Sequence, residues 1–108
     1  MNAAWLYLIA AGLFEIGFAS AIKPMDGHKH LGWTLVFYVC VLSSFSLLER
    51  AAQTLPIGTA FAVWTGIGGL GVALIGMLFL GDPITPLRIT FLILLIVALI
   101  GLKLTAGA

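Results

Sequence analysis

The sequence predicts an all-α membrane protein with four transmembrane helices in a single domain, residues 1–108. Three observations predict this fold class. First, 62% of the 108 residues are hydrophobic and only 8% are charged, whereas a water-soluble domain carries about 25% charged residues. Second, the sequence contains four apolar runs, each near the length of about 20 residues that crosses the hydrocarbon core of a bilayer. Third, eight of the nine charged residues lie at the ends of these runs or between them.

The expected helices cover residues 5–22, 31–48, 57–80 and 87–104. Charged, Pro- and Gly-containing segments separate them, and all four prolines fall in or beside these segments. At such positions a proline does not remove a hydrogen bond from the interior of a helix. No stretch alternates polar and apolar residues with the period of two that a transmembrane barrel requires. We therefore expect helices and no strands.

The fourth expected helix has the clearest start and the most uniform composition. Thr85 is typical of an N-cap, and Pro86 is favoured at the first helical position. No polar residue occurs between Phe91 and Leu102, and Ala98 and Gly101 stand there among leucines and isoleucines. Small residues let another helix approach closely. We therefore expect this helix to form a dimer-packing surface through Ala98 and Gly101.

The composition excludes several classes of function. Five Lys and Arg against four Asp and Glu give a formal net charge of +1, too little for a nucleic-acid-binding surface. The single cysteine, Cys40, allows neither an intramolecular disulfide nor a metal framework built on cysteines. His28 and His30, outside the expected helices, are a weak signal for a metal site. With no nucleophile–base pair either, we expect no enzyme activity, no cofactor and no metal.

A removable leader is not expected at the start of the chain. The small residues Ala19-Ser20-Ala21 are similar to a cleavage site. However, no Lys or Arg precedes the apolar run, and Glu15 interrupts it.

The basic residues are nearly balanced between the two expected sides of the membrane. Lys23, Lys29 and Arg88 would lie on one side, and Arg50 and Lys103 on the other. The excess of basic residues that fixes orientation is therefore close to zero. This balance either lets copies of the chain insert in both orientations or reflects only a weak topological signal.

Glu15 is the one charged residue near the middle of an expected helix. A charged side chain is most costly at this depth, and such residues mark proton, ion or substrate pathways. No Lys or Arg lies in the interior of any expected helix to neutralise it permanently. We therefore interpret Glu15 as the binding site of an exchangeable cation and of protons, rather than as a protonated side chain that only joins helices.

The residues expected around Glu15 come from three helices: Gly12 and Phe18 one turn away on the same face, Ser44 in the second helix, and Phe61 and Trp64 in the third. An indole ring beside a carboxylate attracts an organic cation by charge and by its quadrupole, the latter worth about 2 kcal/mol when desolvated. This combination predicts a site for an organic cation.

The segment from Gly66 to Gly71 matches the pattern G-x-G-x-x-G. It lies inside an apolar run, without the strand and soluble βαβ context that a dinucleotide site requires. We interpret Gly66, Gly68, Gly69 and Gly71 instead as a helix-packing surface or as a bend between two conformations.

The motifs cover nearly the whole chain: Gly12-Leu-Phe-Glu15 with Lys23, Ser44-Phe45, Leu55-Pro-Ile-Gly-Thr-Ala60, Ala62-Val-Trp-Thr-Gly-Ile-Gly68, Arg88, and Gly101-Leu-Lys103. Together they resemble the small multidrug resistance family and, within it, the guanidinium-exporter subgroup. The resemblance implies an antiparallel, dual-topology dimer of eight helices in the bacterial inner membrane. It also implies alternating-access exchange of protons for guanidinium or small substituted guanidinium-type cations. In that mechanism Glu15 binds both ligands, within a network that includes Ser44 and Trp64.

Two residues depart from the pattern of this subgroup. Phe18 stands where a Trp is usual, and Phe61 stands where a Tyr is usual, so two hydrogen-bonding groups are missing. The departures predict either a promiscuous exporter of quaternary-ammonium and other drug-like cations, or one subunit of a heteromeric pair whose partner carries the missing groups. An alternative of another class is a non-transporting membrane subunit that assembles with or regulates another protein.

Overall fold

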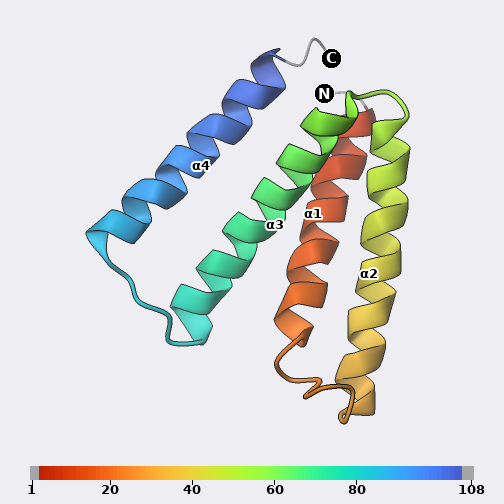
Figure 1. Ribbon diagram of the computed structural model, residues 1–108, viewed down its shortest axis with the longest axis vertical. Helices are drawn as coiled ribbons and strands as arrows, with labels where there is room; N and C mark the ends of the chain where they lie inside the picture. The colour runs from red at the N-terminus through yellow and green to blue at the C-terminus, as the bar shows by residue number, and fades with distance from the viewer. Residues whose placement is uncertain (1–2, 106–108) are drawn as a thin grey trace.

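The computed structural model describes residues 3–105, which form four α-helices joined by short connections (Figure 1). The helices are α1 (Ala3–Ala21), α2 (Leu31–Ala52), α3 (Ile57–Phe79) and α4 (Pro86–Thr105). All four are long and apolar enough to cross a membrane, and no strand occurs within residues 3–105. The predicted all-α fold with four membrane-spanning helices is confirmed.

The ends of the helices follow local capping chemistry. The Thr85 hydroxyl accepts a hydrogen bond of 3.1 Å from the backbone N–H of Arg88, so Thr85 caps α4 as predicted. At the start of α2, Nδ1 of His30 accepts a hydrogen bond of 3.2 Å from the backbone N–H of Trp33. This cap gives one of the two loop histidines a structural role.

The second helix is longer than its apolar run. It continues past Leu48 through Glu49 and Arg50 and ends at Ala52. Glu and Arg are good helix formers, so the first charged residues after an apolar run need not end the helix. As a result, both charged side chains are carried on the last turns of α2.

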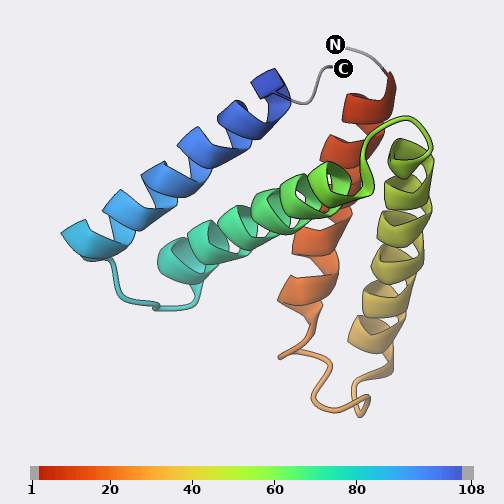
Figure 2. The ribbon, with the colours of Figure 1, turned by 45° about the horizontal axis from the view of Figure 1, so that its top comes forward.

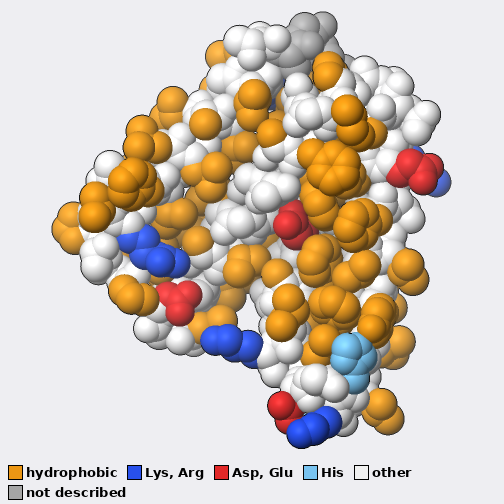
Figure 3. Space-filling model, viewed as in Figure 1, with side chains coloured by type: hydrophobic (Ala, Val, Ile, Leu, Met, Phe, Trp, Pro, Cys, Tyr) orange, Lys and Arg blue, Asp and Glu red, His pale blue; other side chains and the backbone are white. Residues whose placement is uncertain are grey.

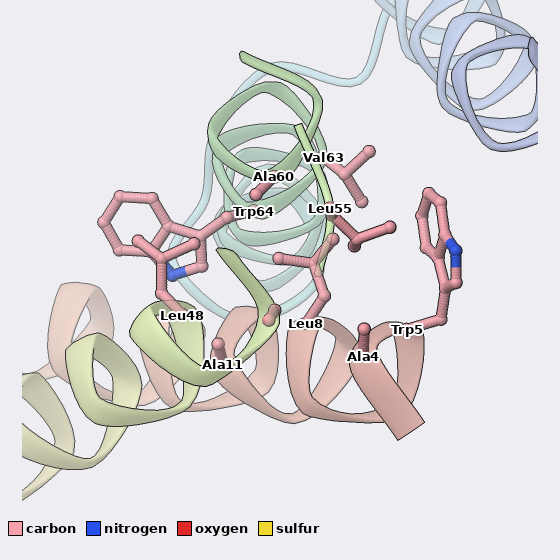
Figure 4. Close-up of a cluster of buried hydrophobic side chains, with 10 residues drawn as sticks. Ala4, Trp5, Leu8, Ala11, Leu48, Leu55, Ala60, Val63 and Trp64 are labelled. Atoms are coloured by element: carbon pink, nitrogen blue, oxygen red, sulfur yellow. The ribbon is translucent and has the colours of Figure 1, made fainter. Parts of the chain in front are cut away.

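The helices form a three-helix core with an outlying fourth helix. α1 packs against α2 and α3, and α4 packs along α3 (Figures 1 and 2). The buried side chains cluster where the start of α1, the end of α2 and the start of α3 meet (Figure 4). Trp5 and Leu8 of α1, Leu48 of α2 and Trp64 of α3 belong to this cluster. No residue of α4 is buried in the chain as described.

Glycines bring α1 and α3 into close contact. A Cβ atom added to Gly12 of α1 would overlap the side chain of Ile67 of α3, and one added to Gly71 of α3 would overlap Ile16 of α1. The two pairs are reciprocal, because each helix offers a glycine to an isoleucine of the other. This is the small-residue packing that lets helix backbones approach within a membrane.

The outer surface is apolar over much of the molecule. Hydrophobic side chains cover the face seen in Figure 3, including the region of α4. On α4, Leu94, Val97 and Leu104 are all more than half exposed. A surface of this kind suits lipid or another apolar helix as its neighbour.

We predict that shortening Leu8, which is fully buried, destabilises the fold far more than the same change at Leu6, which is 55% exposed. Leu8→Ala should lower the free energy of unfolding by about 2–5 kcal/mol, because it leaves a cavity in the core. Leu6→Ala should change it by less than about 0.5 kcal/mol. Denaturation with sodium dodecyl sulfate in mixed micelles, followed by tryptophan fluorescence, measures both. Equal losses would contradict the core described here.

Candidate functional site

Glu15 lies in the middle part of α1, with its carboxyl group against α3. A Cβ atom added to Gly68 of α3 would overlap the Cγ, Cδ and Oε1 atoms of Glu15. The space that the carboxyl group occupies therefore exists because residue 68 has no side chain. Glu15 itself is half-buried, and Gly68 is buried.

The carboxyl group of Glu15 has no permanent partner. Its Oε1 atom is buried and has no hydrogen-bond partner within residues 3–105. The basic residues of the helices, Arg50, Arg88 and Lys103, lie in their first or last turns, away from the level of Glu15. An acceptor of this kind is costly to leave unsatisfied. It is therefore suited to a proton or to a cation that donates hydrogen bonds.

Ser44 of α2 connects three helices by hydrogen bonds, and its contact on α1 is Ala11, one turn before Glu15. Its hydroxyl donates a hydrogen bond of 2.6 Å to the backbone carbonyl of Ala11 in α1. It also accepts a hydrogen bond of 3.0 Å from the indole Nε1–H of Trp64 in α3. Ser44 is fully buried and Trp64 nearly so. The hydroxyl thus bonds between helices, whereas serines in helices often bond back to their own backbone.

Two phenylalanine rings flank Trp64. The ring of Phe45 in α2 lies 5.1 Å from it, and the ring of Phe61 in α3 lies 5.8 Å from it and perpendicular to it. Both phenylalanines remain nearly half exposed, at 48% and 45%. Together the three rings form an aromatic surface beside Ser44.

The other two residues predicted for the site, Phe18 and Gly12, make contacts outside the aromatic surface. Phe18 packs edge-on against Phe37 of α2, with 5.9 Å between ring centroids, and is not in the aromatic surface around Trp64. Gly12 contacts Ile67, and a Cβ atom on Gly66 would overlap Leu99 of α4. The predicted lining role of Phe18 and Gly12 stays a prediction.

The remaining small residues face open space. A Cβ atom added to Gly69 or Gly101 would meet nothing within 4 Å, and Ala98 is exposed. Gly69 therefore differs from its neighbours Gly66, Gly68 and Gly71, each of which accommodates a side chain of another element. Within the described range, no group of three His, Cys, Asp or Glu residues is placed to hold a metal ion.

Sequence reasoning did not identify Phe45 as part of the site or Gly68 as the contact of Glu15. Phe45 stands next to Ser44, but neighbours along a helix point in different directions, so adjacency gives no reason to place it beside Trp64. The glycine run suggested packing without showing which glycine meets which side chain. Both contacts depend on how α1 and α2 are positioned against α3.

Comparison with known proteins gives a consistent result over nearly the whole chain. Residues 3–95 match the family model described as Small Multidrug Resistance protein. The chain is 41% identical over 102 residues to the Guanidinium exporter of Salmonella typhimurium, covering 94% of this chain and 97% of that protein. It is 40% identical over 101 residues to the Guanidinium exporter of Escherichia coli K12, covering 94% and 96%. The Citrobacter freundii Guanidinium exporter is 41% identical over 101 residues, with the same coverage.

We predict different effects for alanine at two adjacent glycines of α3. Gly68→Ala should be less stable than Gly69→Ala by about 1 kcal/mol, because its methyl group must displace the end of the flexible Glu15 side chain. Gly69→Ala should stabilise the protein by about 0.5–1 kcal/mol, because its Cβ meets nothing and alanine is the better helix former. Micelle denaturation of both variants gives the two values. Equal stability of the two variants would contradict the contact between Gly68 and the Glu15 side chain.

Proposed function

The chain belongs to the small multidrug resistance family and is a multi-pass membrane protein, and from this premise we propose that it exports guanidinium-type cations in exchange for protons. The substrate class is guanidinium or a small substituted guanidinium, and the membrane is the bacterial inner membrane. The substrate assignment rests on the relatives, which are named Guanidinium exporter. The observation that carries the mechanism is the carboxyl group of Glu15, whose buried Oε1 atom has no hydrogen-bond partner among residues 3–105.

In the proposed mechanism, protons and organic cations compete for the carboxyl group of Glu15. A proton makes the group neutral, and the cation leaves. Loss of the proton restores an anion, which admits a cation. Guanidinium is planar and presents paired N–H donors, and these match the two oxygens of a carboxylate. Coupling follows because both ligands need the same oxygen atoms, so that one leaves whenever the other binds.

The surroundings of Glu15 support this role by fixing the helices around it. The hydrogen bonds from Trp64 to Ser44 and from Ser44 to Ala11 tie α3 and α2 to α1 one turn from the carboxyl group. The aromatic surface of Phe45, Phe61 and Trp64 offers π faces to a cation. We propose that Ser44, Trp64 and Phe61 line the path of the substrate, together with Phe18 and Gly12.

We further propose that the working unit is a dimer, in which two Glu15 carboxyl groups share one cavity. α4 supports this, because it has no buried residue in the part of the chain described and exposes apolar side chains. The exposed Ala98 and the open space at Gly101 would let a partner helix approach closely. The nearly even distribution of basic residues supports an antiparallel, dual-topology arrangement, with a second copy or a homologous subunit.

We predict that Glu15→Gln abolishes proton-driven exchange. Glutamine has nearly the same shape but cannot exchange a proton, so uptake of guanidinium into vesicles driven by a pH gradient should fall to the level of empty vesicles. Asp26→Asn removes an equal charge from an exposed connection and should leave exchange unchanged. Persistent pH-driven exchange in the Glu15 variant would refute the mechanism. No exchange by the unaltered chain alone would favour a heteromeric or non-transporting subunit.

Promiscuous export of quaternary-ammonium cations is the second candidate, and Phe61 favours it. Its ring lies edge-on to Trp64 and carries no hydroxyl group, so the aromatic surface has fewer groups that could hydrogen-bond to guanidinium.

We predict that Phe61→Tyr increases the preference for guanidinium over tetramethylammonium about fivefold, the effect of one hydrogen bond worth about 1 kcal/mol. Phe37→Tyr, on a ring that packs against Phe18 and Tyr38, is the matched control and should not change the preference. Solid-supported membrane currents for the two cations measure the ratio. Equal transport of tetramethylammonium and guanidinium, both by the unaltered chain and by Phe61→Tyr, would favour promiscuous export.

A further inference from the structure

A pocket of about 490 Å³ lies between the end of α2 and the start of α3. This volume is in the range of about 300–1,000 Å³ that is usual for small-molecule sites. Its lining residues are Phe45, Leu48, Glu49, Ala52, Gln53, Ile57 and Phe61. The walls are aliphatic and aromatic, and the charge and the amide come from the last turns of α2. This pocket does not include Glu15, Ser44 or Trp64.

Glu49 gives the pocket a negative charge, and Arg50, its neighbour along the chain, contacts a residue of another helix. The guanidinium group of Arg50 lies over the ring of Tyr7 in α1, at 6.0 Å from its centroid. The amide of Gln53 donates to the backbone carbonyl of Glu49, at 3.3 Å, and not to its carboxylate. Glu49 also stands in the last turn of α2, where the helix dipole adds further negative potential. The mouth of the pocket is therefore favourable for a cation.

The pocket is continuous with the aromatic surface beside Ser44. Phe45 and Phe61 line the pocket, and the same two rings flank Trp64. Phe45 and Phe61 thus line the same pocket as Glu49, and each also contacts the indole whose N–H group bonds to Ser44. An organic cation that leaves the pocket along these rings can keep both apolar contact and π contact.

We propose that this pocket is a second binding site, in which an organic monocation with an aromatic or alkyl substituent docks before it reaches Glu15. Glu49 attracts the charge, and Phe45 and Phe61 contact the substituent. The proposal rests on the proposed transport function for its place in the transport cycle, although binding in the pocket does not require Glu15. Phenylguanidinium combines the required charge and ring and is the probe.

The transport test measures how each variant changes two quantities for phenylguanidinium, the Michaelis constant and the maximal rate. Glu49→Gln should raise the Michaelis constant about threefold to tenfold, the effect of losing one focusing charge, with the maximal rate changed less than twofold. The double variant Glu49→Gln/Gln53→Glu moves the carboxylate one helix turn along the same pocket and should restore the constant. Asp26→Asn should not alter it. In about 1 M salt, where the Debye length is about 3 Å, the difference should shrink.

A binding test separates this proposal from the transport function. Phenylguanidinium should still bind to purified Glu15→Gln, with reduced affinity, and should lose that binding in Glu15→Gln/Glu49→Gln. Retained binding in the double variant would overturn the proposal even if the unaltered protein transports. Binding that depends on Glu49 in a protein that transports nothing would support the pocket and refute transport by this chain alone. A raised Michaelis constant that Gln53→Glu fails to restore would also overturn the proposal.

Discussion

The contact between the Glu15 carboxyl group and Gly68 is the constraint on which the site depends. A side chain at position 68 would need the space that the carboxyl group occupies, so the carboxyl group can lie against α3 only because this residue is glycine. The reciprocal pairs of Gly12 with Ile67 and Ile16 with Gly71 hold α1 and α3 close together on either side of this contact. The half-buried acid thus lies against a closely packed pair of helices, while its Oε1 atom has no hydrogen-bond partner in the described structure. An ionisable side chain inside a membrane-spanning helix is costly to stability, so this arrangement indicates a function.

The third helix combines tasks that are usually divided among several helices. Its first half contributes Phe61 and Trp64 to the aromatic surface, and its glycines then receive side chains from both neighbours. Gly66 accommodates Leu99 of α4, and Gly68 accommodates Glu15 of α1. α3 is therefore the only described helix in close packing contact with α1, α2 and α4 alike. A change in the position of α3 would therefore alter the contacts of Glu15 and of α4 at the same time.

Much of the fold followed from the sequence, because the length and apolar composition of a membrane-spanning helix are dictated by the bilayer. Thr85 and Pro86 marked the start of α4 by simple capping chemistry. The end of α2 was harder to place, since Glu49 and Arg50 are polar yet favour helix. Glu15, Ser44 and Trp64 could be identified from the sequence as candidate site residues, because a carboxyl group, a hydroxyl group and an indole are unusual inside apolar helices. Three contacts depend on the rotation of each helix: the hydrogen bond from Ser44 to Ala11, the tilted ring contact of Phe45 with Trp64, and the contact of Phe18 with Phe37. The weak amphipathicity of these apolar segments does not fix that rotation.

The even number of helices has a consequence for how a pair of such chains can be encoded. The first residue of α1 and the last residue of α4 lie at the same end of the bundle (Figures 1 and 2). Two copies joined head to tail by a short hydrophilic linker would therefore be threaded through the membrane in the same direction. An inverted pair can arise from separate polypeptides, whereas a single fused polypeptide could form it only with an added segment that crosses the bilayer once more between the two halves. Gene duplication without fusion is accordingly the simpler route by which the two halves of such a pair could diverge.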